Sequence, residues 1–224
     1  MPTLLITGAS RGLGLELARQ YAHDGWRVIG TVREAPAGRK VVKLGAESLT
    51  LDVTDAAQLK QLAARLKGVP IDVLFCNAGI SGKRGTALGN FDFAEWERVL
   101  RVNLLGAAAV IEALVDNVAA SERRIVAVMS SRLASIAESS GMTIPYSTSK
   151  AALNLLAKAL AANLASRGII VVALSPGWVK TDMGGQSAPL TPERSVHGLR
   201  QVIARLRAED SGKFLSYDGS ILPW

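Results

Sequence analysis

The 224-residue sequence predicts an α/β fold, a doubly wound parallel sheet of about seven strands with helices on both faces. Short apolar runs alternate along the chain with segments of helical periodicity, as in strands that helices cover on both sides. Residues with distinctive chemistry directly follow these runs, and parallel sheets bind ligands outside the carboxyl ends of their strands. We therefore expect a Rossmann-type sheet in a single domain, residues 1–224.

The expected elements follow from periodicity and from turn-forming residues. The expected strands are 3–7, 27–32, 48–51, 71–76, 125–129, 169–174 and 213–216. The expected helices are 13–24, 54–67 with Thr54 as its cap, 92–117 with a break near Asn103 and Gly106, 146–166 and 191–207. The stretch 33–48 is too short for a full crossover helix, so we expect one irregular or short helical turn there.

Composition excludes several classes of protein. Hydrophobic residues make up 49% and charged residues 20% of the chain, which argues against disorder. The first residues lack the charged start of a signal peptide, and no apolar run is long enough to span a bilayer, so we expect no membrane partner. One cysteine, Cys76, fits a reducing cytoplasm. His23 and His197 make no convincing metal cluster with it, so we expect no metal.

The net charge of +7 is spread over scattered basic residues, and aromatic residues account for only 5%. The chain therefore has few aromatic side chains on which the bases of a single-stranded nucleic acid could stack, and we expect no nucleic-acid partner. A positive field around a small ligand that carries phosphate suits this distribution, with ordinary solvated surface as the larger part of it.

A glycine-rich loop lies between the first strand and its helix, in the pattern Gly8-x-x-x-Gly12-x-Gly14. Glycines there let backbone amides approach a pyrophosphate, which the helix N-terminus also attracts. The alternative is a turn that merely needs glycines. The position directly after the first strand favours a dinucleotide site.

The same loop contains Gly8-x-Ser10-x-Gly12, which matches the nucleophile elbow of hydrolases, and Asp182 and His197 follow in the order of a triad. Only seven residues precede Gly8, however. The chain therefore has no earlier strands to put an elbow in mid-sheet, and we favour Ser10 as a phosphate-loop residue.

Arg11 lies in this loop, and Arg33 follows the second strand, where an acidic residue would bind the ribose hydroxyls of NAD. Two guanidinium groups converging there would suit a 2′-phosphate, so we expect NADP(H) over NAD(H). The neighbouring Glu34 and the alternative of two solvated arginines weigh against this preference.

Tyr146 and Lys150 are four residues apart, so on a helix they share a face. A neighbouring ammonium lowers the pKa of a phenol, which could then deliver a proton near neutral pH as a general acid. Taken alone, such a pair is more often a solvated coincidence. It gains weight from Ser130-Ser131, which ends a strand shortly upstream.

Several motifs together resemble the short-chain dehydrogenase/reductase family. They are Thr7-Gly8-x-x-x-Gly12-x-Gly14, Asn77-Ala78-Gly79, Asn103, Ser131, Tyr146-x-x-x-Lys150 and Pro176-Gly177 with Thr181. They occur in the order of the family and cover essentially the whole chain. The stretches 147–154, 176–183 and 218–224 are most similar to the subgroup of C-factor proteins and sniffer-type carbonyl reductases.

The resemblance implies an oxidoreductase that transfers hydride between NADP(H) and a small aldehyde, ketone or alcohol. Tyr146 would exchange the proton, Ser131 would hold the carbonyl oxygen, Lys150 would bind the nicotinamide ribose, and Asn103 would hold a water of a proton relay. The residues expected to bind the cofactor are Gly8, Ser10, Arg11, Gly12, Leu13, Gly14, Arg33, Asp52, Val53, Asn77, Ala78, Gly79, Tyr146, Lys150, Pro176, Gly177, Val179 and Thr181.

Three alternatives stay open. The spacing from Ser131 to Tyr146 is two residues longer than in most members, so Ser130 and Ser135 remain candidates for the serine role. The helix from Tyr146 is apolar nearly all round, which predicts a homodimer or a neighbouring helix of the same chain. A cofactor-binding signalling protein of the C-factor type, with little or no turnover, is the alternative to an enzyme.

Overall fold

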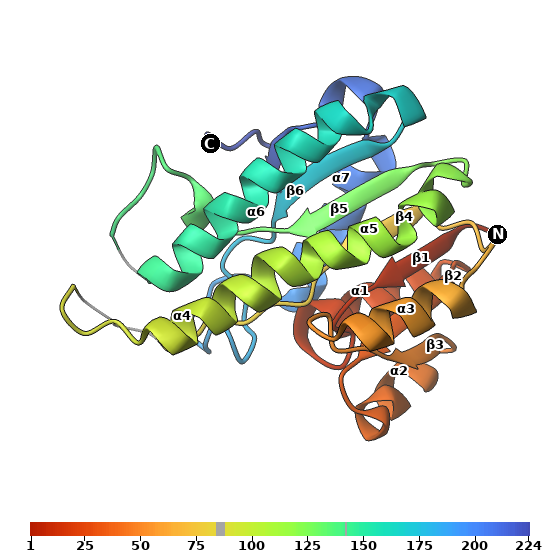
Figure 1. Ribbon diagram of the computed structural model, residues 1–224, viewed down its shortest axis with the longest axis horizontal. Helices are drawn as coiled ribbons and strands as arrows, with labels where there is room; N and C mark the ends of the chain where they lie inside the picture. The colour runs from red at the N-terminus through yellow and green to blue at the C-terminus, as the bar shows by residue number, and fades with distance from the viewer. Residues whose placement is uncertain (84–87, 142) are drawn as a thin grey trace.

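The computed structural model describes residues 1–83, 88–141 and 143–224 and contains one seven-stranded sheet with every strand pair parallel (Figure 1). The strand order is β3-β2-β1-β4-β5-β6-β7. The strands are β1 (Thr3–Ile6), β2 (Arg27–Val32), β3 (Glu47–Thr50), β4 (Val73–Cys76), β5 (Ile125–Met129), β6 (Ile170–Ser175) and β7 (Phe214–Ser216). The predicted fold class, a doubly wound Rossmann-type sheet, is confirmed.

Helices cover both faces of this sheet, and the central strands are therefore buried on both sides. The α-helices are α1 (Gly12–His23), α2 (Arg39–Val42), α3 (Ala56–Arg65), α4 (Phe93–Leu100), α5 (Gly106–Ala119), α6 (Ile144–Asn163) and α7 (Pro192–Arg205). Short 3-10 turns are η1 (Ala35–Gly38), η3 (Arg132–Ala134), η4 (Ala165–Arg167) and η5 (Ala208–Asp210), and η2 (Arg101–Leu105) is a π-helical turn.

The core is divided into two layers by the sheet. One layer packs α3, α5 and α6 on the face toward the viewer in Figure 1, through residues such as Leu62, Val110 and Leu153. The other packs α1, α2 and α7 on the opposite face, through Leu17, Val41 and Val196 among others.

The direction of winding reverses between β1 and β4, since the chain runs outward to β3 on one side and to β7 on the other. At such a switch point the connections leave in opposite directions and open a crevice at the carboxyl ends of the two strands. Gly8 follows β1 and Asn77 follows β4, so both lie at this crevice.

The predicted elements are all present, with two local differences. The cap of α3 is Asp55, whose carboxylate accepts hydrogen bonds from the amides of Ala57 and Gln58, so the assignment of Thr54 was wrong. Thr54 instead donates to Asp52 Oδ1 (2.7 Å). The predicted break near Asn103 is the turn η2, which widens the helix between α4 and α5 without interrupting it.

Candidate active site

The glycine loop is packed too tightly for any larger residue at Gly14. A Cβ there would collide with the carbonyl oxygen of Gly8 and with the side-chain amide of Asn77. Gly8 and Gly12 have φ values of 73° and 55°, in the left-handed region that glycine adopts without strain. A Cβ on Gly12 would meet only the side chain of Thr181, whose methyl group would lie 3.7 Å away. The loop therefore has the close backbone path that a dinucleotide pyrophosphate requires.

Asn77 and Thr7 tie the two sides of the switch-point crevice together. Asn77 Nδ2 donates to the carbonyl oxygens of Thr7 (2.9 Å) and Gly8 (3.1 Å). Thr7 Oγ1 accepts hydrogen bonds from the amides of Asn77 and Ala78, both at 3.0 Å. The predicted Asn77 thus holds the glycine loop in place. Thr7 was missing from the predicted site, although its position directly before Gly8 could have identified it.

The N-terminus of α1 is free to meet an anion. Its cap is Arg11, which has no side-chain hydrogen bond to the helix, and its first turn contains no acidic residue. The first amides of a helix have no partner within it, and together with the helix dipole they favour a phosphate at this end. Together with the close backbone path at Gly14, this helix N-terminus fits the pyrophosphate of a dinucleotide.

Arg11 and Arg33 are not joined by any contact within the described residues. Arg11 Nη1 instead pairs with Asp182 Oδ2 at 2.6 Å, across the crevice from the loop after β6. Arg33 is exposed and has no ion pair in the parts of the chain that the structure describes. The predicted convergence of the two guanidinium groups on a 2′-phosphate therefore stays a prediction, and Arg33 at the end of β2 has no ion pair among the described residues.

The predicted residues after β3 and β6 also line the carboxyl edge. Asp52 Oδ1 is engaged by Thr54, and Val53 is buried against Gly106, where a Cβ would collide with it. The loop after β6 contains Pro176, Gly177, Val179 and Thr181. Thr181 Oγ1 accepts from the amide of Gly184 (3.0 Å), and Val179 forms a β-bridge with Leu190. These contacts hold the loop opposite Gly12.

Tyr146 and Lys150 lie one turn apart on α6, with Lys150 Nζ 5.8 Å from the centre of the Tyr146 ring. Lys150 is 3% exposed and donates to the carbonyl oxygen of Met129 at 2.6 Å. Burial lowers the pKa of Lys150 to about 8. A buried ammonium held by a carbonyl group, without a carboxylate, keeps its charge only up to mildly alkaline pH.

The pKa of Tyr146 is raised above its ordinary value, because burial disfavours the phenolate, and a hydrogen bond with Ser131 partly offsets this effect. The predicted lowering by Lys150 is therefore wrong. The physical reason is desolvation, which acts on both groups and outweighs an ammonium that points to Met129. Tyr146 is consequently protonated over the whole neutral range, as a proton donor requires.

Ser131 is the serine that contacts Tyr146, and the two alternatives are occupied elsewhere. Ser130 Oγ donates to Asn154 Oδ1 at 2.6 Å in the interior. Ser135 Oγ donates to the backbone oxygen of Trp224 (3.3 Å) and accepts from the amide of Glu138 (3.1 Å). The geometry therefore favours Ser131 over Ser130 and Ser135.

Asn103 connects the turn η2 to α6. Its Oδ1 accepts from the amide of Ile80 (2.8 Å), and its Nδ2 donates to Ile80 O (2.9 Å) and to Ser149 Oγ (3.0 Å). Ser149 Oγ in turn donates to the carbonyl oxygen of Tyr146 at 2.7 Å. The side chain of Asn103 thus joins α6 to the segment after β4. Sequence analysis missed Ser149, although it stands between Tyr146 and Lys150.

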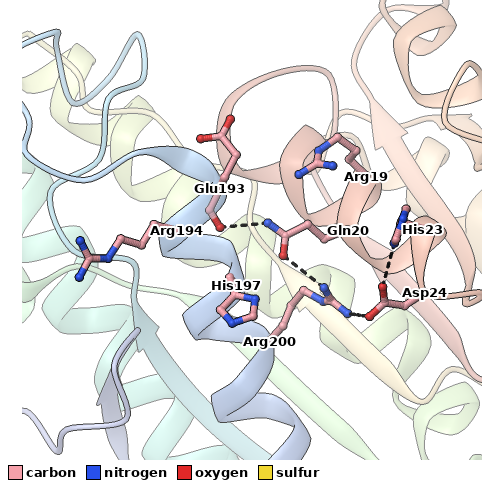
Figure 2. A pocket seen from close by; sticks show the side chains of 8 residues that line it. All are labelled: Arg19, Gln20, His23, Asp24, Glu193, Arg194, His197 and Arg200. Atoms are coloured by element: carbon pink, nitrogen blue, oxygen red, sulfur yellow. Dashed lines mark hydrogen bonds and ion pairs between the residues drawn. The ribbon is translucent and has the colours of Figure 1, made fainter.

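The hydrolase alternative is not assembled in the described part of the chain. Asp182 pairs with Arg11, and His197 lies on α7, where its Nε2 is 3.0 Å from Gln201 Nε2. His197 faces a separate hollow of about 440 Å³ between α1 and α7 (Figure 2). This hollow is lined by Arg19, Gln20, His23, Asp24, Glu193, Arg194, His197 and Arg200.

The side chains of that hollow mostly satisfy one another. Arg200 donates to Gln20 Oε1 (3.2 Å) and pairs with Asp24 (Figure 2). Its guanidinium also lies 4.8 Å from the centre of the Tyr21 ring. The hydrogen bond from Arg200 holds the pKa of Asp24 below its ordinary value. A second hollow, of about 460 Å³, lies beside β3 and is lined by Ala35, Gly38, Arg39, Val42, Lys43, Ser48 and Thr50.

Two further features bear on the class of protein. Among the residues that the structure describes, no three histidine, cysteine or acidic side chains gather as metal ligands would. Within the same residues, every helix is too short or too polar to cross a bilayer.

Comparison with known proteins agrees with this geometry. The family model for short chain dehydrogenases matches residues 2–190. The chain is 41% identical over 156 residues to the C-signal protein of Myxococcus xanthus, covering 69% of this chain and 93% of that protein. It is 32% identical to a 1-hydroxy-2-glutathionyl-2-methyl-3-butene dehydrogenase of Rhodococcus, over the full length of both.

Solved structures give the same result. The carbonyl reductase Sniffer of D. melanogaster superposes with a TM-score of 0.91 at 32% identity and covers all of both chains. An NADPH-bound carbonyl reductase from chicken fatty liver gives 0.91 at 30%, and an NADP-bound protein from Burkholderia multivorans gives 0.89 at 35%. Each of these covers 100% of this chain and 99% of the other. The chain therefore belongs to the short-chain dehydrogenase/reductase family of oxidoreductases, near the C-factor and sniffer-type subgroup.

Proposed function

We propose that this protein is an NADP(H)-dependent carbonyl reductase that interconverts small aldehydes or ketones and their alcohols. The observations that support it most are that Ser131 lowers the pKa of the Tyr146 phenol as a hydrogen-bond partner does, and that Lys150 lies one turn away at the same edge as the glycine loop. Both parts of the proposed site lie in one domain, residues 1–224. Similarity to carbonyl reductases with bound NADP or NADPH supports the cofactor.

The residues would hold the dinucleotide along the carboxyl edge. The amides of the loop from Gly8 to Gly14 and the N-terminus of α1 would bind the pyrophosphate. Arg33 would bind the 2′-phosphate, since it is a free guanidinium at the end of β2. Asp52 and Val53 would border the adenine, Ala78 and Gly79 the middle of the cofactor, and the loop from Pro176 to Thr181 the nicotinamide. When bound, the cofactor supplies the hydride.

The chain itself would orient the carbonyl group and move the proton. Ser131 and Tyr146 would both donate hydrogen bonds to the carbonyl oxygen, where negative charge develops during reduction. The phenolic proton of Tyr146 would pass to that oxygen as the alcohol forms. The ammonium of Lys150 would then stabilise the phenolate that remains, at an interior position where charges interact strongly.

Gly79 places Lys150 and Asn103 together beside the proposed nicotinamide position. A Cβ on Gly79 would lie 3.2 Å from Asn103 Oδ1 and 3.5 Å from Lys150 Nζ. The space next to Lys150 is therefore narrow, and the amide side chain of Asn103 is fixed there by Ile80 and Ser149. We infer that Asn103 supports a water relay to Lys150 by fixing the walls around it.

The test is consumption of NADPH with a panel of small aldehydes and ketones, comparing the wild type with Tyr146→Phe. We expect Tyr146→Phe to bind NADPH normally and to lose about 10²- to 10⁴-fold in kcat, because the general acid is absent. A wild type that binds NADPH but reduces no carbonyl would contradict the proposal and favour a signalling role like that of the C-signal relative. A matched NADH titration tests the cofactor preference, with Arg33→Ala expected to reduce it.

We also propose that the protein is a cytoplasmic homodimer. The face formed by α5 and α6 exposes Leu155 (68%), and Leu105 in the turn before α5 is 57% exposed, which a second subunit would cover. Sedimentation at micromolar concentration should show a dimer, and Leu155→Glu should shift it to monomer. A wild type that sediments only as a monomer would overturn this part of the proposal.

A further inference from the structure

The segment after β7 folds back across the sheet edge and brings Trp224 to the loop that contains Ser131. Its path is fixed by the antiparallel bridge between Leu215 and Ile221 and by a hydrogen bond from the amide of Leu222 to the oxygen of Phe214 (2.8 Å). Leu222 is itself buried in the layer with α6. The last described residues are therefore an integral part of the core beside α6.

The backbone oxygen of Trp224 accepts three hydrogen bonds from one turn of that loop. The amides of Ile136 and Ala137 donate to it at 3.0 Å each, and Ser135 Oγ donates at 3.3 Å. Ser135 is 2% exposed, so its hydroxyl has no access to water as an alternative partner. Three converging donors on one oxygen hold the loop at a defined position.

The indole of Trp224 is held on its own side by β7 and α6. It stacks on the ring of Phe214, with 5.7 Å between the ring centres, and the ammonium of Lys158 lies 4.9 Å from its centre. Phe214 is 1% exposed, and Lys158 belongs to the same helix as Tyr146. Trp224 therefore connects the loop after β5 with the helix that carries the phenol.

Only a short, internally bonded turn separates this contact from Ser131. Ser131 Oγ accepts from the amide of Leu133 (3.2 Å), and the amide of Ala134 donates to Ser131 O (2.9 Å). An ion pair between Arg132 and Glu138 (2.6 Å) closes the same loop. A displacement of residues 135–137 is therefore transmitted to Ser131.

We propose that Trp224 is a positioning residue that holds the Ser131 loop against α6 and so keeps Ser131 beside the phenol of Tyr146. The inference rests on the proposed function, because it concerns the same proton transfer. Loss of the indole would leave the loop attached to α6 by fewer contacts, and Ser131 would no longer stay in line with the phenol. Cofactor binding should not change, since the glycine loop follows β1, two strands away from β5 in the sheet.

A double-mutant cycle tests this directly, with Trp224→Ala, Ser131→Ala and the double variant. We expect Trp224→Ala to lower kcat by roughly tenfold to a hundredfold, as a small misplacement of a reacting group does, with KM for NADPH unchanged. In the Ser131→Ala background the same change should have almost no further effect on kcat. Additive losses, or an unchanged kcat in Trp224→Ala, would overturn the proposal.

Two variants separate positioning from general stability. Trp224→Phe keeps a ring that can stack on Phe214 and face Lys158, so it should recover most of kcat. Trp26→Ala removes an indole on the opposite face, where it packs on Tyr21, and should lower Tm while leaving kcat unchanged. If Trp224→Ala does not fold, Ser135→Ala replaces it in the cycle, since it removes one donor to the same oxygen.

Amide hydrogen exchange gives a result that does not depend on turnover. Residues 132–138 should exchange faster in Trp224→Ala than in the wild type, and at near wild-type rates in Trp224→Phe. If the wild type reduces no carbonyl, the proposed function fails, yet the exchange rates still decide whether Trp224 fixes the loop. Unchanged exchange of residues 132–138 in Trp224→Ala would overturn the inference in either case.

Discussion

The candidate active site around Tyr146 and Lys150, at the carboxyl edge of the sheet, and the hollow between α1 and α7 both contain charged side chains. They differ in whether those charges are paired. Arg200 in the hollow is matched by Asp24 and by the amide oxygen of Gln20. Lys150 at the edge faces no carboxylate among the described residues. The pKa of the nearby Cys76 is raised to about 12 by burial, so its thiol is neutral as well. Of these two regions, the edge is the one where a buried charge has no ion-pair partner among the described residues, and there burial lowers the pKa of Lys150 to about 8.

Under the proposed function, this difference separates residues that contribute to stability from residues that contribute to activity. A paired charge contributes to stability and has no reason to react. An unpaired buried charge makes the native state less stable, and it is retained where chemistry needs it. Substitutions and pH changes in the two regions should therefore have different effects on kcat and on the free energy of unfolding.

The largest effect is expected for Lys150→Met. The rate should fall at least about 10²-fold, because no ammonium would stabilise the Tyr146 phenolate. Stability should nevertheless rise. A folded-state pKa of about 8 against an ordinary 10.5 means that charging Lys150 opposes folding below pH 8, and this penalty fades as pH rises toward 10.5. At pH 7 its removal is worth roughly 3 kcal/mol, less about 1–2 for the orphaned Met129 carbonyl.

Urea unfolding of wild type and Lys150→Met at pH 7 and pH 10 measures this gain, with Lys158→Met as the control on the same helix. A variant less stable than the wild type at pH 7 would show that Lys150 is compensated after all.

The second prediction concerns pH. The rate of carbonyl reduction should decrease about tenfold per pH unit above about 8, as Lys150 loses its proton. Tyr146, with its raised pKa, remains protonated over that range and does not limit the rate. Stopped-flow reduction between pH 6 and 10 provides the profile, and Lys150→Arg should move the alkaline limb upward. A flat profile to pH 10 would contradict the role of Lys150.

The third prediction distinguishes Ser130 from Ser131. Ser130→Ala leaves Asn154 without its buried partner, and Asn154 Nδ2 already lacks one within the described residues. We expect a loss of about 1–3 kcal/mol in the free energy of unfolding with kcat little changed. Ser131→Ala should show the reverse, a large loss of kcat at nearly constant stability. Equal kcat losses in the two variants would reopen the assignment.

The smallest effect is expected in the hollow. Arg200→Met should lower stability by about 1 kcal/mol, since the partly exposed pair with Asp24 and the contact with the Tyr21 ring are lost. The effect should grow as the pH is raised from 3 to 6, because Asp24 has a lowered pKa and is the charged partner only above it. Thermal unfolding across that range measures it. Any change in kcat would mean that the two regions are coupled.

The fold could be predicted well from the sequence because strands and helices are indicated by short, local patterns of apolar residues. Continuous apolar runs such as 71–76 and 125–129 can hardly be other than buried strands, and the residues after them then meet at one edge. The same reasoning brought Gly14, Asn77, Ser131 and Tyr146 together without knowledge of any distance.

What could not be predicted depends on side-chain burial and on contacts across the chain. Spacing gave Tyr146 a nearby ammonium and hence a lowered pKa, but only the structure shows that burial prevails and that Lys150 points to Met129. Thr54 and Asp55 are both good caps, and the local path of the chain decides between them. The contact of Trp224 with residues 135–137 spans almost ninety residues of sequence and has no local signal.

The π turn η2 sets the phase of the helix that runs from α4 to α5. Its amide of Gly106 bonds to Arg101, five residues back, so the turn holds one residue more than an α-helical turn. Deleting one residue within 101–105 would restore regular α-helical geometry, but everything after it would rotate by about 100° and shift by about 1.5 Å. Either Asn103 would leave Ile80 and Ser149, or Gly106 would leave Val53. The extra residue is thus the means by which one helix meets two fixed surfaces, and it should tolerate substitution far better than deletion.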